Sequence, residues 1–187
     1  MGKNKTDGKT STPLNAFVLF GIASVLLVTA ALLKSFPLLI FAGLAPFFAI
    51  VDKTSEQEKF WNYAELILIA LTLFIFAGHL FDFTFLIPSL VQSILLSLAF
   101  VGYAFARQSL GPRLGKLTIL FFWLGFEYLF LKLHQSDRML FLADTLQLQS
   151  EWLKWTHFTG YLGISAWILM ANLLLYHAVF KGQLNWL

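Results

Sequence analysis

The chain has 187 residues, of which 58% are hydrophobic and 12% are charged, and its formal net charge is +3. Soluble domains are about 45–50% apolar and about 25% charged, so this composition excludes an ordinary soluble domain and favours an integral membrane protein. The few basic residues lie between apolar runs and form no stripe, which argues against a nucleic-acid-binding protein.

The N-terminal segment, residues 1–13, is polar and contains three lysines. It resembles the start of a signal peptide, but the apolar run that follows is long and ends in a poor cleavage site. We therefore expect residues 1–13 to be a cytoplasmic polar N-terminus. Residues 14–187 are expected to form a single polytopic membrane domain.

Six apolar runs approach the roughly 20 residues that a membrane-spanning helix needs. The second run is short and contains Pro46, which predicts a tilted, kinked or partly inserted helix. The fold class predicted is thus an all-α integral membrane protein, a bundle of about six transmembrane helices. The predicted spans are 15–33, 36–51, 61–80, 86–106, 117–133 and 160–180.

Basic residues are distributed unevenly over the segments between these runs. With the N-terminus inside, nine Lys and Arg lie on the cytoplasmic side and four on the other, in agreement with the positive-inside rule. An even number of spans places both termini in the cytoplasm. The longest connection, residues 134–159, then forms an outer-face loop.

The outer loop contains an amphipathic pattern. Apolar side chains recur at spacings of four, three and three residues, as in a helix that lies in the membrane interface with one side down. The alternative is that the two tryptophans are ordinary belt residues before a span. The pattern consists of Leu148, Trp152, Trp155 and Phe158.

Glu127 is the eleventh residue of the fifth run and is therefore expected near the middle of the membrane. A carboxyl group there is costly, so it should be partnered or protonated and should face the bundle. Two readings remain open. Glu127 is either a buried acid beside a lipid or substrate cavity, or a structural acid bonded to another helix.

Ser165, Asn172 and Tyr176 are spaced by seven and four residues and share one face of the last run. Polar side chains in such positions join helices more often than they bind substrate. We expect helix–helix contacts here, with a binding role as the alternative.

Motifs for metal binding and for soluble-type catalysis are missing from the sequence. His79 and Asp82 have only His134 and His157 as further outer-face histidines, and no ligand spacing of a metal site is present. There is no Cys, which excludes disulfides and thiolate chemistry. We expect no cofactor, no metal and no catalytic residue. A weaker alternative is a small membrane enzyme in which Glu127 or His157 acts as an acid–base group.

Four features resemble the N-terminal membrane domain of apolipoprotein N-acyltransferase, the bacterial enzyme that adds the last acyl chain to lipoproteins. They extend over about residues 15–180. The outer loop is similar to the family's periplasmic segment between its fifth and sixth helices. The other three are the proline-flanked second run from Phe36-Pro37-Leu38 to Leu44-Ala45-Pro46-Phe47, the Phe122–Glu127 segment of the fifth run, and the stretch Trp155–Asn172, in which Gly160, Gly163, Ser165 and Asn172 mark the entry into the last helix.

The sequence departs from this family at its catalytic apparatus. The family carries a periplasmic nitrilase-like domain with a Glu-Lys-Cys triad after its seventh helix, and this chain contains no Cys. A thioester intermediate needs a thiolate, so no catalytic residue carries over. What the resemblance implies is a bacterial inner-membrane protein that handles phospholipid or lipidated protein, as the membrane half of a split enzyme or with another membrane or periplasmic partner.

The alternative function is a structural or assembly subunit of an inner-membrane complex, in which Glu127 and Asn172 would face a partner helix. The candidate residues that would face lipid or a partner, or would lie at the interface, are Glu127, Trp123, Trp152, Trp155, His157, Ser165, Asn172 and Tyr176. Membrane lipids are the expected ligands, and no nucleic acid is expected.

Overall fold

The computed structural model describes residues 16–33, 37–56, 61–133, 139–146 and 156–181. Within these ranges the chain is all-helical and has no strand. The main helices are α1 (Ala16–Leu32), α3 (Ala45–Glu56), α4 (Trp61–Gly78), α5 (Leu86–Leu114), α6 (Thr118–Lys132) and α7 (Thr156–Leu175). Short elements are η1 (Pro37–Leu39), α2 (Ile40–Gly43), η2 (Phe83–Phe85), η3 (Gly115–Leu117), η5 (Leu142–Leu146) and the π-helix η7 (Tyr176–Lys181).

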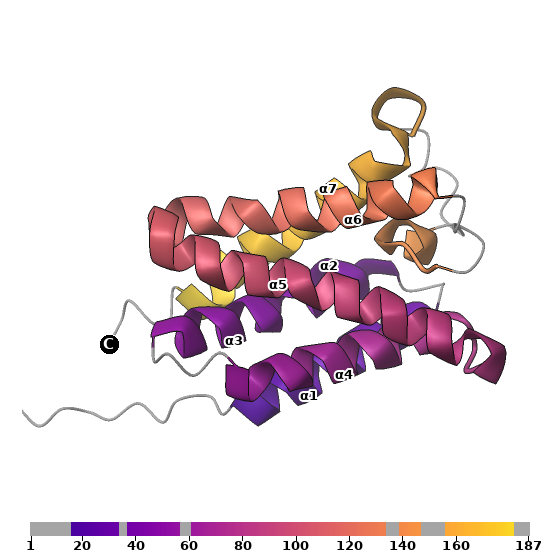
Figure 1. The fold of residues 1–187 in the computed structure, drawn as a ribbon, viewed down its shortest axis with the longest axis horizontal. Helices are drawn as coiled ribbons and strands as arrows, with labels where there is room; N and C mark the ends of the chain where they lie inside the picture. The colour runs from indigo at the N-terminus through magenta and orange to yellow at the C-terminus, as the bar shows by residue number, and fades with distance from the viewer. Residues whose placement is uncertain (1–15, 34–36, 57–60, 134–138, 147–155, 182–187) are drawn as a thin grey trace, which may run out of the picture.

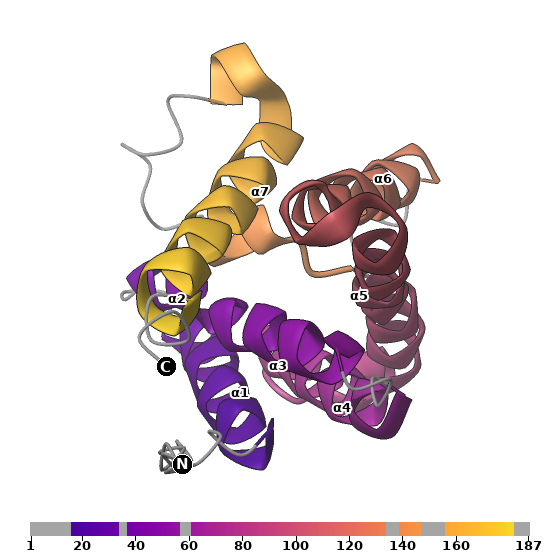
Figure 2. The same ribbon diagram turned by 90° about the vertical axis from the view of Figure 1, so that its left-hand side faces the viewer.

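The long helices run side by side, so the molecule has two ends (Figure 1). The start of α1, the end of α7 and the turn from α5 to α6 lie at one end, here called the inner end. Seen end-on, α1, α4, α5 and α6 follow one another around the bundle, and α7 with α2 completes it (Figure 2). The core is built from the apolar sides of these helices and from α3, whose Phe47 and Phe48 are fully buried.

The second apolar run is not one helix but the series η1, α2 and α3. It breaks at Leu44, and Pro46 lies in the first turn of α3, where a proline is tolerated. The side chain of Asn172 in α7 binds the break: its Oδ1 accepts from the N–H groups of Leu44 at 2.8 Å and Ala45 at 3.0 Å. Its Nδ2 donates to the carbonyl of Ile40 at 2.8 Å.

Two helices end later than the sequence predicts. Helix α3 continues to Glu56 instead of ending at Val51, and α5 continues to Leu114 instead of ending at Ala106. Both extensions carry charged residues that are held by tertiary contacts, which hydropathy does not register. Helix α5 bends at Gly111, whose φ of +79° suits glycine.

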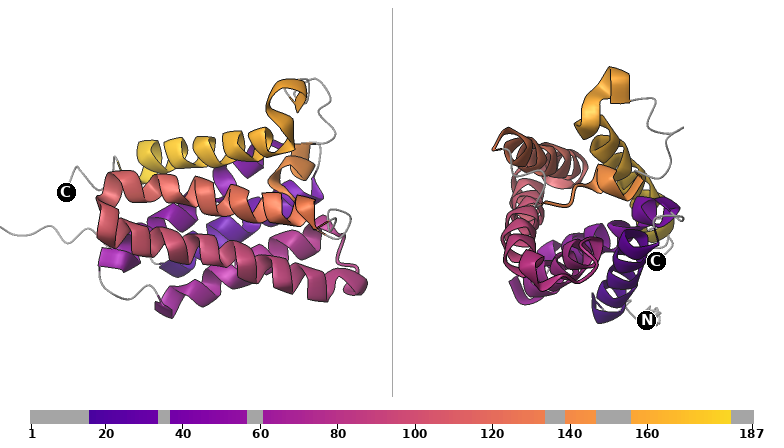
Figure 3. Two further views of the ribbon diagram at one scale, coloured as in Figure 1. Left: turned by 45° about the horizontal axis from the view of Figure 1, so that its top comes forward. Right: turned by 90° about the vertical axis from the view of Figure 1, so that its right-hand side faces the viewer.

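The start of α7 is bent at Gly160, where φ is +68°. The turn before this residue projects from the bundle (Figure 3). Helix α7 therefore begins at Thr156, four residues before the predicted start at Gly160, but its straight part begins where the sequence places it.

Two helical stretches in the described ranges are long and apolar enough to cross a membrane, residues 83–111 and 159–180. Residues 16–32 and 63–78 form shorter apolar helices. The all-helical prediction is confirmed over the described residues. The interfacial helix centred on Trp152 and Trp155 lies outside them.

Candidate functional site

Part of the segment predicted as an outer-face loop, residues 134–159, does not lie on the surface but enters the bundle. We call residues 139–146 the plug. Its side chains of Phe141, Leu142, Ala143 and Leu146 are at most 3% exposed. The plug contacts α7 and lies between α6 and α7 (Figure 2). This differs from the exposed loop that hydropathy predicts for residues 134–159, and the apolar side chains of the plug are the physical reason.

Side chains from α5 and α6 hold the backbone of the plug. Gln92 donates from Nε2 to the carbonyl of Leu140 at 2.6 Å, and its Oε1 accepts from the Leu140 N–H at 3.0 Å. Glu127 Oε1 accepts from the Leu142 N–H at 3.2 Å. Irregular backbone is tolerated inside an apolar bundle only when such partners satisfy it.

A third contact comes from α7. Asp144 Oδ2 accepts from the Phe141 N–H at 2.7 Å, which fixes the turn of the plug. The hydroxyl of Tyr161 donates to Asp144 Oδ1, and the Tyr161 ring packs edge-on against Phe141 with ring centroids 5.6 Å apart. The plug is thus tied to all three surrounding helices.

Glu127 is 1% exposed and faces the interior of the bundle. The indole of Trp123, one turn earlier on α6, donates to its Oε1 at 3.1 Å. Ser165 on α7 lies beside the carboxyl group. Among the described residues, Glu127 Oε2 and Ser165 Oγ have no hydrogen-bond partner outside this pair.

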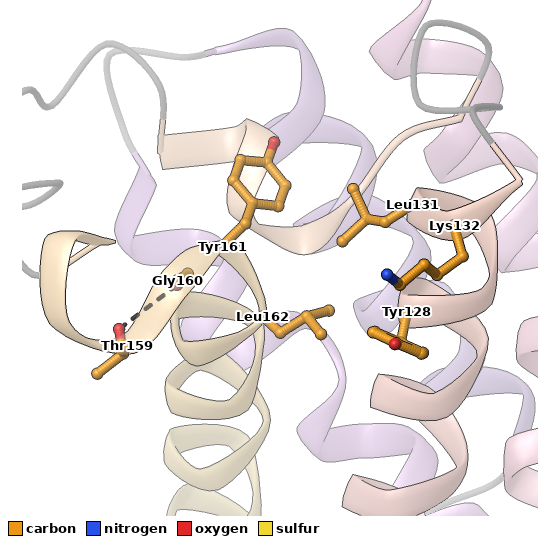
Figure 4. A pocket seen from close by; sticks show the side chains of 7 residues that line it. All are labelled: Tyr128, Leu131, Lys132, Thr159, Gly160, Tyr161 and Leu162. Atoms are coloured by element: carbon orange, nitrogen blue, oxygen red, sulfur yellow. Dashed lines mark hydrogen bonds between the residues drawn. The ribbon is translucent and has the colours of Figure 1, made fainter.

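A cavity of about 460 Å³ opens between the C-terminal end of α6 and the N-terminal part of α7. Residues 128, 131 and 132 of α6 face residues 159–162 of α7 across it (Figure 4). Its walls combine the apolar side chains of Leu131 and Leu162 with two tyrosines and one cation, Lys132. The Lys132 ammonium lies 5.6 Å from the centroid of the Tyr128 ring.

The cavity and the buried Glu127–Ser165 pair are neighbours along the same two helices. Leu131 follows Glu127 by four residues, and Tyr161 precedes Ser165 by four residues. Residues spaced by four share a helix face, about one turn or 5–6 Å apart along the axis. The polar pair therefore lies roughly one turn deeper in the bundle than the cavity walls.

A second polar cluster lies at the inner end and is centred on Asp52 of α3. Arg107 and Lys116 each place a nitrogen 3.0 Å from one of its carboxylate oxygens. The hydroxyls of Tyr103 and Tyr176 donate to the same carboxylate. Lys116 also lies 4.3 Å from the centroid of the Tyr176 ring.

Asp52 directly follows the second apolar run. Burial raises the pKa of Asp52. The hydrogen bonds from Tyr103 and Tyr176 and the charge of Lys116 lower it by more, so the net pKa lies below the ordinary 3.8. The carboxylate is therefore ionised at neutral pH and joins α3, α5, η3 and η7.

The structure separates the predicted site residues into groups. Trp123, Glu127 and Ser165 come together below the cavity, whereas Asn172 and Tyr176 lie deeper, at the α2–α3 break and in the Asp52 cluster. All five are buried within this chain and do not face its surface. Trp152, Trp155 and the side chain of His157 lie outside the described residues.

Other residues of these sites are missed by the sequence reasoning. The plug, Asp144 and Tyr161 are among them, as are Asp52, Arg107 and Lys116. A signal was available for Asp52, because an acid directly after an apolar run on the basic side of the membrane can pair with those bases. Within the described ranges, no three His, Cys, Asp or Glu side chains gather in a way that could hold a metal ion.

Comparison with protein-family models, curated proteins and solved structures finds no match to this chain.

Proposed function

We propose that this chain is a multi-pass protein of the bacterial inner membrane that handles phospholipid or lipidated protein, in the manner of the membrane domain of lipoprotein N-acyltransferase. Its N-terminus is cytoplasmic, and the plug and the cavity lie at the outer side. The cavity between α6 and α7 is the observation that carries the lipid assignment.

The exposed surface of the long helices supports the membrane assignment. Large apolar side chains face outward on α1, α4, α5, α6 and α7, including Val25 at 65% exposure, Ile87 at 73%, Phe121 at 77% and Leu174 at 69%. Soluble monomers rarely expose apolar patches of more than a few hundred Å², whereas a lipid-facing surface requires them.

The chemistry of the cavity fits a phospholipid. Its volume lies in the range of ligand sites, about 300–1,000 Å³. Apolar walls suit acyl chains, and the ammonium of Lys132 at the predicted outer end of α6 suits a phosphate, which it binds as a point charge. The hydroxyl of Tyr128 adds a hydrogen-bonding group to the same cavity.

A partner completes this function. These 187 residues contain no Cys, so an acyl transfer through a thioester requires a thiolate that they do not supply. We infer that the chain binds lipid and presents it to such a partner.

The test is purification of the chain from its native membrane in a mild detergent, followed by native mass spectrometry of bound lipids and identification of copurifying proteins. We expect retained phospholipid, and about two- to fivefold less of it for Lys132→Gln, as expected from loss of one partly exposed charge contact. Lys53→Gln, at the inner end, is the control and should retain the lipid.

Recovery of a separate Cys-bearing nitrilase-like chain supports the split-enzyme form of the proposal. If only bulk lipid is retained, in equal amounts by Lys132→Gln and Lys53→Gln, the lipid assignment is wrong. The assembly-subunit alternative expects Glu127 and Asn172 to face a partner, but both bond within this chain and are at most 1% exposed, so no observation favours it.

A further inference from the structure

We propose that Tyr161 is a positioning residue that couples the plug to the lipid cavity. Docking of the plug holds one wall of the cavity in place, and lipid in the cavity in turn stabilises the docked plug. This inference rests on the proposed function, because it takes a phospholipid as the occupant of the cavity.

Tyr161 belongs to both structures. It lines the cavity together with Leu162 and the side chains of α6. Its hydroxyl is turned away from Tyr128 and Lys132 (Figure 4), and it donates to Asp144 of the plug. The ring also packs against Phe141 of the plug. One side chain is therefore shared by the wall of the cavity and the support of the plug.

The plug also has anchors that are separate from the cavity. Gln92 and Glu127 hold its backbone from α5 and α6, and neither residue lines the cavity. The plug can therefore be docked while the cavity is empty, and it then fixes the position of Tyr161 before lipid binds. Cavity occupancy acts on the plug through the same tyrosine.

The position of Tyr161 in α7 makes this support necessary. It directly follows Gly160, whose positive φ interrupts the helix. A side chain beside such a kink has only part of a helix around it to restrict its rotamer, and its hydroxyl contact with Asp144 supplies the missing restraint. Fixing a cavity wall before binding removes an entropic cost from binding. By linkage, the lipid must then stabilise the docked plug by the same factor.

The absence of Cys from the sequence allows single-cysteine reporters without background. Leu142→Cys places a thiol in the plug at a position that is 1% exposed, and Phe83→Cys places one at a position that is 79% exposed. Labelling by a maleimide is followed in detergent on delipidated full-length chain. The probe is dioleoyl phosphatidylglycerol, and dioleoylglycerol is the control without phosphate.

We expect the phospholipid to slow the labelling of Leu142→Cys and to leave that of Phe83→Cys unchanged. Tyr161→Phe keeps the ring and removes the bond to Asp144. Because the acceptor is a carboxylate, we expect labelling of the plug reporter to rise about tenfold and phospholipid binding to weaken, by at most a similar factor. Without phospholipid, Tyr128→Phe, in the same cavity, should leave labelling of the plug unchanged.

Asp144→Asn tests the same contact from the plug side and should add little in the Tyr161→Phe background, because both changes remove one interaction. Phospholipid binding with no effect on the plug reporter would overturn the coupling and leave the lipid site intact. So would equal effects of Tyr161→Phe and Tyr128→Phe. No phospholipid binding by the unchanged chain, seen in the titration alone, would overturn the proposed function and the coupling together.

Discussion

Replacement of Asn172 by Leu tests the contact that joins the last helix to the broken second run. The substitution keeps the size of the side chain but removes its four hydrogen bonds, to Leu44, Ala45, Ile40 and Ile168. The main cost comes from two N–H donors at the α2–α3 break, which lose their acceptor in a fully buried site. Each such loss costs about 1–3 kcal/mol.

We expect Asn172→Leu to lower the free energy of unfolding by about 2–4 kcal/mol, near the low end of this sum, because the Leu44 N–H also approaches the carbonyl of Ala42. The assay is reversible unfolding in mixed micelles of rising SDS fraction, followed by tryptophan fluorescence. Met170→Leu, on the exposed side of the same helix, is the control and should change stability by less than about 0.5 kcal/mol. Equal stability of the two variants would refute the reasoning.

Three further changes probe other contacts. Asp52→Asn should destabilise the chain by about 3–5 kcal/mol, because it discharges the centre of a buried ion cluster, whereas Asp82→Asn at a fully exposed position should have little effect in the same unfolding assay. Because the folded pKa of Asp52 lies below 3.8, its contribution is complete above that pH and is lost as the pH falls through the lower folded value, so acid titration of Asp52→Asn should lack this loss. Gln92→Leu removes both side-chain bonds to the plug backbone and should raise the labelling rate of a buried plug cysteine about tenfold; an unchanged rate would mean that these bonds do not hold the plug. A Cβ at Gly115 would lie 2.6 Å from the Arg107 Cα, so Gly115→Ala should lower stability by about 1–3 kcal/mol, whereas Gly125→Ala, with open space around it, should be neutral or stabilising by up to about 1 kcal/mol; the same result for both would contradict the packing argument.

The sequence predicts the positions of the apolar helices well where hydropathy and burial agree. Helices α1 and α4 begin and end within two residues of the predicted runs, and Glu127 faces the bundle as the cost of an exposed membrane acid requires. The prolonged ends of α3 and α5 could not be found this way. Charged residues of the two helix ends bind one another across the bundle. A hydropathy average registers only their charge and therefore ends both helices too early.

The plug shows a second limit of sequence reasoning. Residues 139–146 have no helical period and lie between polar residues, so they read as part of a loop. Their burial depends on bonds to Gln92, 48 positions earlier than Leu140, and on a socket formed by three helices. Asp144 and Tyr161 come into contact only when the three helices have formed that socket. The apolar run Met139–Ala143 is a local signal of burial, but the sequence holds no local signal for the partners of this segment.

The Asp52 cluster also orders the assembly of the chain in time. Its carboxylate is synthesised with α3, but the hydroxyl of Tyr103 follows 51 positions later and that of Tyr176 follows 124 positions later. Until the last helix is made, the Asp52 carboxylate lacks one of its two tyrosine donors. A chain truncated before α7 therefore lacks the Tyr176 donor, although Arg107 and Lys116 already pair with the carboxylate.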